Sequence, residues 1–394
     1  MMKSAALLVT VSLLSLGSLL SGCGLTPTEG EEALEKSLSE VVEKDDAVRN
    51  AALHVDSELL QLDQTWGMGV ANAGAGDDMT ASSPYLSASV GKLFTSATIM
   101  VLADEGALAL DDDITRWLDP ELIAGLPVTG GDAALDEITL RRLMGHRSGL
   151  PDYFSGETRG GAPTVLELMT DEPGRSWTPE SLLQYTKDHF AAVGGPGEVF
   201  EYADTNYDLL GLVIEAATGE AFHEVVRAKI LDPLALNSTW YHQHEAPPEG
   251  LASYADVWLE DHNAAGTAAL SLDWAGGGLA TTSDDLARFL RSLSEGEPVS
   301  LERFQEVWSA DAVTEGVDYG YGLWRVRPAE LSIFLRGFPD MLGVSGATGS
   351  YAYYIPEYDA VVTGTFDQLL YEEEHIVFLV SEVLPVLERV RVED

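Results

Sequence analysis

The chain has 394 residues, of which 45% are hydrophobic and 22% charged, and this is enough to form one large globular unit or two packed subdomains. Its charge is one-sided, because 65 acidic residues stand against 22 basic ones and give a formal net charge of -43. Such a charge excludes nucleic acid as a partner, and its self-repulsion, which molar salt screens, favours a saline habitat over the alternative of an ordinary acidic secreted protein.

The first 22 residues have the pattern of a signal peptide. Lys3 supplies a positive charge, and residues 5–20 form an apolar run with interspersed serine and glycine. As a helix this run would be about 24 Å long, which is shorter than the roughly 30 Å hydrocarbon core of a bilayer. The run is followed by Leu20-Ser21-Gly22-Cys23, which resembles a bacterial lipobox. We therefore expect removal of residues 1–22 rather than a transmembrane helix.

Cys23 is the only cysteine, so the chain can form no intramolecular disulfide. The lipobox resemblance implies a diacylglycerol-type modification of Cys23, and two acyl chains hold a protein stably on a membrane. The alternative is a signal peptide with a chance cysteine. The sequence thus predicts an exported, membrane-anchored lipoprotein of the cell envelope, in which the acidic residues 23–50 form a lipid-anchored tether with a short helix over 31–44.

Strand patterns lie at both ends of the remaining chain and helical patterns lie between them. Predicted strands cover residues 51–60, 65–71, 319–326, 351–355 and 360–365. Predicted helices cover residues 89–102, 138–145, 179–189, 207–218 and 222–231, a helix capped by Ser283 or Asp284 and ending near 293, and an amphipathic helix over 371–389. We expect an α+β fold, in which residues 51–390 form an antiparallel sheet flanked by helices, with a mostly helical subdomain inserted over about 104–270.

Ser89 and Lys92 form the first cluster with chemical potential. Residues three apart share one face of a helix, so the amine of Lys92 can reach the hydroxyl of Ser89 at the start of the predicted helix. The helix beyond them is apolar, and a lysine that faces an apolar interior is costly unless it is paired or has a catalytic role. The pattern favours a nucleophile with its base over a chance surface lysine.

Tyr202 and Asp204 belong to a second cluster, which runs into the apolar helix predicted at 207–218. The phenol of Tyr202 can relay protons, and the carboxylate of Asp204 can orient Lys92 or hold its charge. Taken alone, the segment is also compatible with aromatic packing and a helix cap by Asp204.

A third cluster is the small-residue segment 343–350, which contains Ser345, Gly346 and Ala347 and precedes a tyrosine-rich strand pattern. Small residues let a backbone approach a ligand closely and donate its N–H groups to it. Alone, the segment is equally typical of an ordinary loop.

Together the three clusters resemble the serine β-lactamase-like, penicillin-binding family, which includes class C β-lactamases, DD-peptidases and related esterases and D-aminopeptidases. Four further segments carry the resemblance in the family's order, so that it covers about residues 50–390. They are ITLRRLMGHRSGLPDY from Ile138, YADTNYDLLGLVIE from Tyr202, GGGLATTSDDLARFL from Gly276 and YGYGLW from Tyr319. The resemblance implies a β-lactamase/transpeptidase-like fold.

The resemblance also implies roles for single residues. Ser89 would be the nucleophile, Lys92 its activating amine and Tyr202 the general acid/base. The backbone N–H groups of Ser89 and Ala347 would form an oxyanion hole, beside Ser345 and Gly346.

At two positions the chain departs from the family pattern. Asp204 stands where the family usually has asparagine, and Val344 stands where it usually has lysine or histidine. The second change removes a cation that would bind a substrate carboxylate.

The sequence therefore predicts a serine hydrolase that forms an acyl-enzyme on Ser89 and acts on an amide, a β-lactam, a D-Ala-D-Ala peptide or an ester, with a small-molecule or peptidoglycan-like substrate. Free lysine and tyrosine have pKa values near about 10.4 and 10, so we expect the pKa of Lys92 or Tyr202 to be lowered. The alternative is a lipoprotein that binds β-lactam or peptidoglycan without hydrolysing it. No cofactor is expected, and His242 and His244 have too few neighbours to suggest a metal site.

Overall fold

In the computed structural model, which describes residues 24–259, 261–371 and 374–392, nine strands form one antiparallel sheet. The predicted signal peptide and Cys23 lie outside the described residues. The strand order is β3-β2-β1-β14-β13-β12-β11-β10-β9. The strands are β1 (Asn50–Ser57), β2 (Leu62–Asn72), β3 (Asp77–Asp78), β9 (Ser309–Thr314), β10 (Val317–Tyr319), β11 (Trp324–Val326), β12 (Met341–Ser345), β13 (Tyr351–Ile355) and β14 (Ala360–Thr365).

Strands from the two ends of the chain pair in the middle of this sheet. β1 lies between β2 and β14, with Leu53 opposite Gly364 in the β1–β14 ladder. Both strands are buried along nearly their whole length, because α10 (Ser283–Glu295) packs against one face and other elements cover the opposite face. This arrangement confirms a sheet built from distant parts of the chain.

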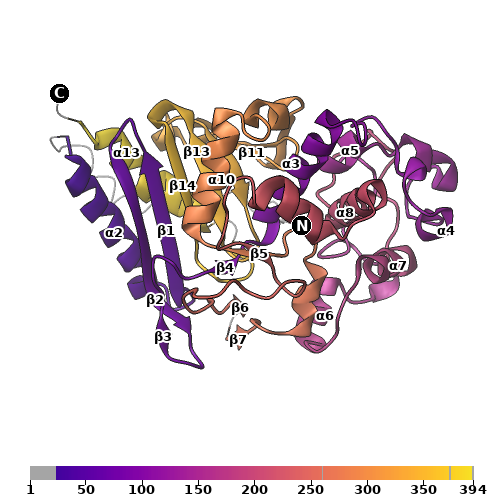
Figure 1. Cartoon of the computed structure of the whole chain (residues 1–394), viewed down its shortest axis with the longest axis horizontal. Helices are drawn as coiled ribbons and strands as arrows, with labels where there is room; N and C mark the ends of the chain where they lie inside the picture. The colour runs from indigo at the N-terminus through magenta and orange to yellow at the C-terminus, as the bar shows by residue number, and fades with distance from the viewer. Residues whose placement is uncertain (1–23, 260, 372–373, 393–394) are drawn as a thin grey trace.

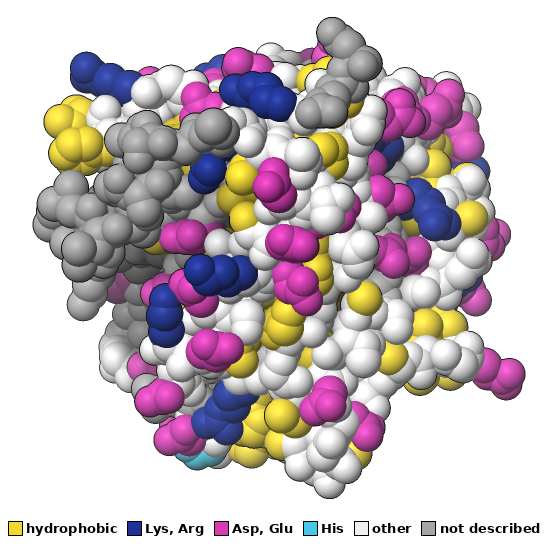
Figure 2. All heavy atoms as spheres, turned by 90° about the vertical axis from the view of Figure 1, so that its left-hand side faces the viewer, with side chains coloured by type: hydrophobic (Ala, Val, Ile, Leu, Met, Phe, Trp, Pro, Cys, Tyr) yellow, Lys and Arg dark blue, Asp and Glu magenta, His cyan; other side chains and the backbone are white. Residues whose placement is uncertain are grey.

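The helix α2 (Pro27–Lys44) is part of the folded body. A capping box between Thr26 and Glu29 begins it, and Leu34 and Leu38 are buried against the neighbouring elements. It packs on β2 and on α13 (Leu384–Arg389), and a backbone bridge pairs Leu25 with Val390. The helix predicted over 31–44 is present and begins earlier, at Pro27, and the helical spacing of its leucines marks the face that packs on the folded body. Figure 2 looks onto this side of the molecule, where acidic side chains are spread over the surface between fewer basic ones.

A mostly helical region lies on the other side of the central helix α3 (Gly91–Asp104), as Figure 1 shows. α3 joins the two halves, because Phe94 stacks on Phe289 of α10 at a centroid distance of 3.8 Å while the helix also packs on α8. The helices of this region are α4 (Pro120–Ile123), α5 (Leu140–Met144), α6 (Val165–Asp171), α7 (Pro179–His189), α8 (Asp204–Thr218) and α9 (Phe222–Val226). Short strands also occur: β4 (Tyr85–Leu86), β5 (Trp240–Tyr241), β6 (Trp258–Leu259), β7 (His262–Asn263) and β8 (Leu279–Thr281). The mixed fold with a helical insertion is as predicted.

Several boundaries differ from the prediction. The cap of α10 is Thr282, whose side chain accepts the N–H of Asp285, rather than Ser283 or Asp284. The strand expected over 319–326 is two strands, β10 and β11, because Gly322 turns the chain between them with a φ of +78°. The last helical stretch divides into α12 (Glu374–Phe378), a wider turn over 379–383 and α13. Within the described residues no helix is both long and apolar enough to cross a bilayer.

Candidate active site

Ser89 lies on a tight turn, η1 (Ala88–Val90), directly before α3. Ala88 has a φ of +44°, which is rare for a residue with a side chain and marks a strained backbone next to the serine. The turn is held by Ser87, whose N–H donates to the carbonyl of Leu279 at 2.8 Å and whose hydroxyl donates to that of Gly277 at 3.2 Å. Ser89 is half-buried beside fully buried neighbours, so its hydroxyl stands at a fixed and partly accessible position.

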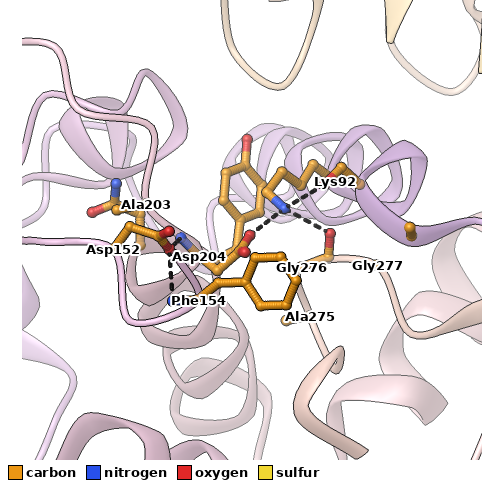
Figure 3. A network of polar contacts seen from close by, with 12 residues as sticks. Lys92, Asp152, Phe154, Ala203, Asp204, Ala275, Gly276 and Gly277 are labelled. Carbon is orange, nitrogen blue, oxygen red and sulfur yellow. Dashed lines mark hydrogen bonds and ion pairs between the residues drawn. The ribbon is translucent and has the colours of Figure 1, made fainter. Parts of the chain in front are cut away.

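The side chain of Lys92 is buried and meets three oxygen atoms. Its ammonium group donates to the Ser89 hydroxyl at 3.2 Å. It also donates to the Asp204 carboxylate at 2.6 Å and to the Gly276 carbonyl at 3.0 Å (Figure 3). Burial is the largest single influence on Lys92 and lowers its pKa, but the electrostatic interactions with Asp204, Tyr202 and Asp273 and the hydrogen bond to Asp204 together hold this pKa well above its usual value. The expected lowering of the lysine pKa is therefore wrong for Lys92, which is an ammonium ion in the resting site.

Asp204 is the first residue of α8, and Asp152 fixes its position. The residue before it, Ala203, offers no side-chain cap, and the carboxylate of Asp152 accepts the N–H of Asp204 at 3.1 Å instead. The same carboxylate accepts the N–H groups of Phe154 and Ser155 at 3.2 and 2.8 Å (Figure 3). Burial, and then the charge of Asp204, raise the pKa of Asp152. Asp152 was not singled out from the sequence, where only the resemblance segment that ends at Tyr153 contains it.

Tyr202 lies beside the same lysine. The centre of its ring is 5.2 Å from the Lys92 ammonium nitrogen and 4.3 Å from the centre of the His146 ring. His146 holds the turn that carries Tyr202, since its Nδ1 accepts the N–H of Ala203 at 3.1 Å and lies 2.9 Å from the amide nitrogen of Asn206. Burial lowers the pKa of His146 well below its usual value, so the ring is a neutral acceptor. The second cluster is thus joined to the first.

The third cluster is attached to the chain segment just before Ser89. The hydroxyl of Thr348 donates to the carbonyl of Leu86 at 2.9 Å, and the hydroxyl of Ser350 donates to that of Ser87 at 2.5 Å. At Gly346 an added β-carbon would lie 2.6 Å from the Ser87 carbonyl oxygen, so the close approach requires glycine. The neighbouring Ala347 uses its carbonyl to accept the N–H of Leu370 at 2.7 Å.

Ser345 and Val344 point to opposite faces of β12, as successive strand residues do. The Ser345 hydroxyl is 2.7 Å from the Tyr353 hydroxyl and hydrogen-bonds Nε2 of His375, so its side chain is engaged inside the protein. Burial lowers the pKa of His375 to about 4, which keeps this ring neutral. Val344 is 1% exposed and belongs to the main core. Any contact of Ser345 with a ligand would therefore come from its backbone.

The two histidines near β5 are engaged with aromatic rings. His242 stacks on Tyr254 with ring centres 5.4 Å apart, and His244 stacks on His223 at 5.6 Å. In the part of the chain that the structure describes, no group of three or more histidine, cysteine or acidic side chains is placed to hold a metal ion.

Comparison with known proteins identifies relatives of this chain. A sequence model described as Beta-lactamase matches residues 40–376. Penicillin-binding protein 4* of Bacillus subtilis (strain 168) is 26% identical over 249 residues, which are 60% of this chain and 51% of that protein. The chain thus spans about half the length of this curated relative.

Two solved structures share the fold over most of the chain. The D-amino acid amidase of Ochrobactrum anthropi SV3, complexed with D-phenylalanine, superposes with a TM-score of 0.73 at 21% identity, over 92% of this chain and 99% of that one. EstCE1, described as a hydrolase with promiscuous acyltransferase activity, superposes with a TM-score of 0.69 at 18% identity, over 91% and 98%.

Proposed function

The chain belongs to the Beta-lactamase family, and from that premise we propose that it is a serine hydrolase that forms an acyl-enzyme on Ser89. The observation that carries the proposal is the 3.2 Å contact between the Lys92 ammonium nitrogen and the Ser89 hydroxyl, in a buried site that also contains Tyr202. A serine nucleophile is activated by an adjacent base, and the buried amine of Lys92 is placed to be that base.

The proposed cycle begins with a proton shift inside the Lys92–Asp204 ion pair. When Asp204 takes a proton from the ammonium group, Lys92 becomes a neutral amine and can accept the hydroxyl proton of Ser89. The Ser89 oxygen attacks the substrate carbonyl carbon while Tyr202 donates a proton to the leaving group, and the acyl group is then bonded to Ser89. In the second half of the cycle the Tyr202 phenolate takes a proton from water, which attacks the ester and releases the acid. Lys92 returns a proton to the departing Ser89 oxygen and takes back the proton that Asp204 holds, so that the resting site is restored.

We propose neutral esters and amides as the preferred substrates. Val344 offers an isopropyl group where the family resemblance implies a basic side chain, and Asp204 adds a negative charge. Both features disfavour a substrate carboxylate near Ser89. The relatives support this range, because one is named an amidase for D-amino acids and another a hydrolase with acyltransferase activity.

A panel of four substrates tests the proposal: a penicillin, a D-Ala-D-Ala peptide, a D-amino-acid amide and a neutral ester, each with the wild-type chain and with Ser89→Ala. We expect turnover of the ester or the amide that is absent in Ser89→Ala. Stoichiometric labelling of Ser89 by penicillin without turnover of any substrate would instead identify a non-hydrolysing receptor. Turnover that persists in Ser89→Ala would contradict the assignment of the nucleophile.

The same proposal includes the cell envelope as the location. The lipobox-like segment ending at Cys23 supports an exported lipoprotein, and the folded body already begins at Leu25, which bridges to Val390. A lipid on Cys23 would then hold the body close to the bilayer surface.

A further inference from the structure

A second carboxylate, that of Asp273, reaches the point where Lys92 and Asp204 meet. A β-carbon added to Gly276 would lie 3.4 Å from Oδ1 of Asp273, 3.4 Å from Nζ of Lys92 and 3.5 Å from Oδ1 of Asp204. Figure 3 shows Gly276 beside the ammonium group, to which its carbonyl is bonded. At Gly277 an added β-carbon would lie 2.8 Å from the same Asp273 oxygen. The three side chains thus converge on Gly276, which leaves room for them, and Gly277 leaves room for Asp273.

The loop that carries Asp273 is held rigidly. Next to it, Trp274 is 5% exposed and packs edge-on against Phe222 with ring centres 4.9 Å apart. The carbonyl of Ala275 accepts the hydroxyl of Thr95 from α3 at 2.7 Å, and the carbonyl of Trp274 accepts the N–H of Gly278 at 2.9 Å. These contacts hold the backbone that follows Asp273 and so keep its carboxylate near Lys92.

Asp273 differs from Asp204 in how it acts on the lysine. Asp204 accepts a direct hydrogen bond from Lys92, whereas Asp273 interacts with it through space. Burial raises the pKa of Asp273 to about 7, an effect that the Lys92 ammonium opposes and the Asp204 charge reinforces. The titratable groups that face Asp273 are Lys92 on α3, Asp204 and Asp208 on α8, Tyr153 in the loop after α5, and Tyr241 on β5.

We propose that Asp273 is a positioning residue that, when ionised, holds Lys92 in its ammonium form and so restrains the Ser89 nucleophile. The proposal rests on the proposed function, since it concerns the amine that activates Ser89. When Asp273 carries a proton, the lysine faces one carboxylate, and its proton passes to Asp204 more easily. When Asp273 loses that proton, the lysine faces two carboxylates, and a neutral amine becomes rarer. The acidity of the medium would thereby set the reactivity of the serine.

Asp273→Asn tests this proposal, because it keeps the shape of the side chain and removes its charge. The measurement is kcat/KM for a neutral chromogenic ester from pH 5.5 to 9, at constant ionic strength. We expect the ratio of variant to wild-type kcat/KM to rise about tenfold between pH 5.5 and 8.5, which is the effect of one unit in the pKa of Lys92. A ratio that stays constant over this range would overturn the proposal.

The matched control is Asp285→Asn. Asp285 is a buried aspartate with a raised pKa on α10, where it accepts the N–H of Ser238 and the hydroxyl of Thr239, and Lys92 is not among the groups that shift its pKa. The ratio of kcat/KM of Asp285→Asn to that of the wild type should stay constant with pH. Thermal melts check that each variant is folded, and Asp273→Ser replaces the asparagine variant if that one unfolds.

The rate of Ser89 labelling by a fluorophosphonate separates the two proposals, because it reports nucleophile reactivity without turnover. A labelling rate whose variant-to-wild-type ratio rises with pH supports the role of Asp273 even if the ester is not turned over. If the ratio of the two labelling rates does not change with pH, the role of Asp273 is overturned, but the proposal of a serine hydrolase still stands. An unreactive Ser89 in the wild type would refute both.

Discussion

The carboxylate of Asp204 lies 2.6 Å from the ammonium nitrogen of Lys92, closer than the Ser89 hydroxyl at 3.2 Å that this lysine is proposed to activate. Where the family pattern has a neutral asparagine, this chain has a charge that stabilises the ammonium form. The same carboxylate is the nearest acceptor for the proton that Lys92 must lose. The strength of this one ion pair therefore governs the proposed catalysis.

Replacing Asp204 by asparagine should shift the pH dependence of catalysis. Asp204→Asn keeps a hydrogen-bond acceptor for Lys92 but removes the negative charge that raises the lysine pKa. We expect the rising limb of kcat/KM against pH to move to lower pH by at least about one unit. The measurement is a pH profile on the neutral ester. An unchanged limb would show that the ionisation of Lys92 does not control the rate.

Replacing Lys92 should abolish turnover and also weaken the fold. The structure places this residue in a buried ion pair with Asp204. Lys92→Met would leave the carboxylate of Asp204 without its partner, and breaking a buried pair in this way typically costs about 3–5 kcal/mol. We expect a clear drop in melting temperature, with less than a tenth of the wild-type turnover remaining.

The double variant Lys92→Met/Asp204→Asn separates these two effects. It removes both charges, so it should recover much of the lost melting temperature without recovering turnover. Ser89→Ala serves as the control, because it should lose turnover at nearly unchanged stability. If Lys92→Met alone melted like the wild type, the ion pair would not contribute to stability.

Replacing Val344 by histidine should widen the substrate range. A hydrogen bond from a charged donor typically contributes about 1.5–3 kcal/mol, which corresponds to roughly ten- to 150-fold in rate. Val344 is 1% exposed, so the imidazole has to displace core contacts before it can reach a substrate. In a variant whose melting temperature shows that it is folded, we expect Val344→His to raise kcat/KM by about this factor on substrates with a carboxylate and to change it little on a neutral ester. Val344→Ala, which alters volume without adding a donor, is the matched control. Equal gains on both substrate classes would mean that Val344 does not restrict the range.

Replacing Cys23 by serine should release the protein from membranes. If Cys23 carries the lipid, the wild-type protein partitions with the membrane fraction and Cys23→Ser does not, because that variant lacks the sulfur to which the acyl chains would be attached. The measurement is fractionation of expressing cells followed by detection of the protein. Equal membrane association of both proteins would leave the lipoprotein proposal without support.

The parts of the fold that the sequence predicted are those with strong local patterns. The helix over 179–189 was predicted with the observed bounds, because Pro179 stands at its first position and Thr178 caps it. β13 and β14 were likewise predicted with their observed bounds, since short runs of branched and aromatic residues define them. β12 was missed, because its glycine and serine leave little strand pattern and its place between β11 and β13 fixes it instead.

The candidate site likewise contains some residues whose proximity follows from the local sequence and others that only the tertiary fold brings together. Ser89 and Lys92 lie three residues apart, so their proximity follows from helix geometry. Asp152 and Asp273 each stand alone in a loop, and only the tertiary fold brings them to Lys92 and Asp204. In the sequence, each is marked only by its surroundings, since an aspartate stands among apolar and small residues, as in the segment SLDWAGGG from Ser271. Burial of a carboxyl group is costly, so an aspartate in such a segment indicates a specific role.

The hydrogen bond between Ser350 and Ser87 joins residues that are 263 positions apart in the sequence. Strand β1 likewise pairs with β14, which comes much later in the chain, with Leu53 opposite Gly364. A nascent chain that has emerged as far as α10 therefore contains Ser89, Lys92, Tyr202 and Asp204 but lacks the strands that complete the sheet around them. Pairings this distant slow folding, because a long loop must close before they form. The chain must therefore be synthesised through β14 before the sheet beside Ser89 can be completed.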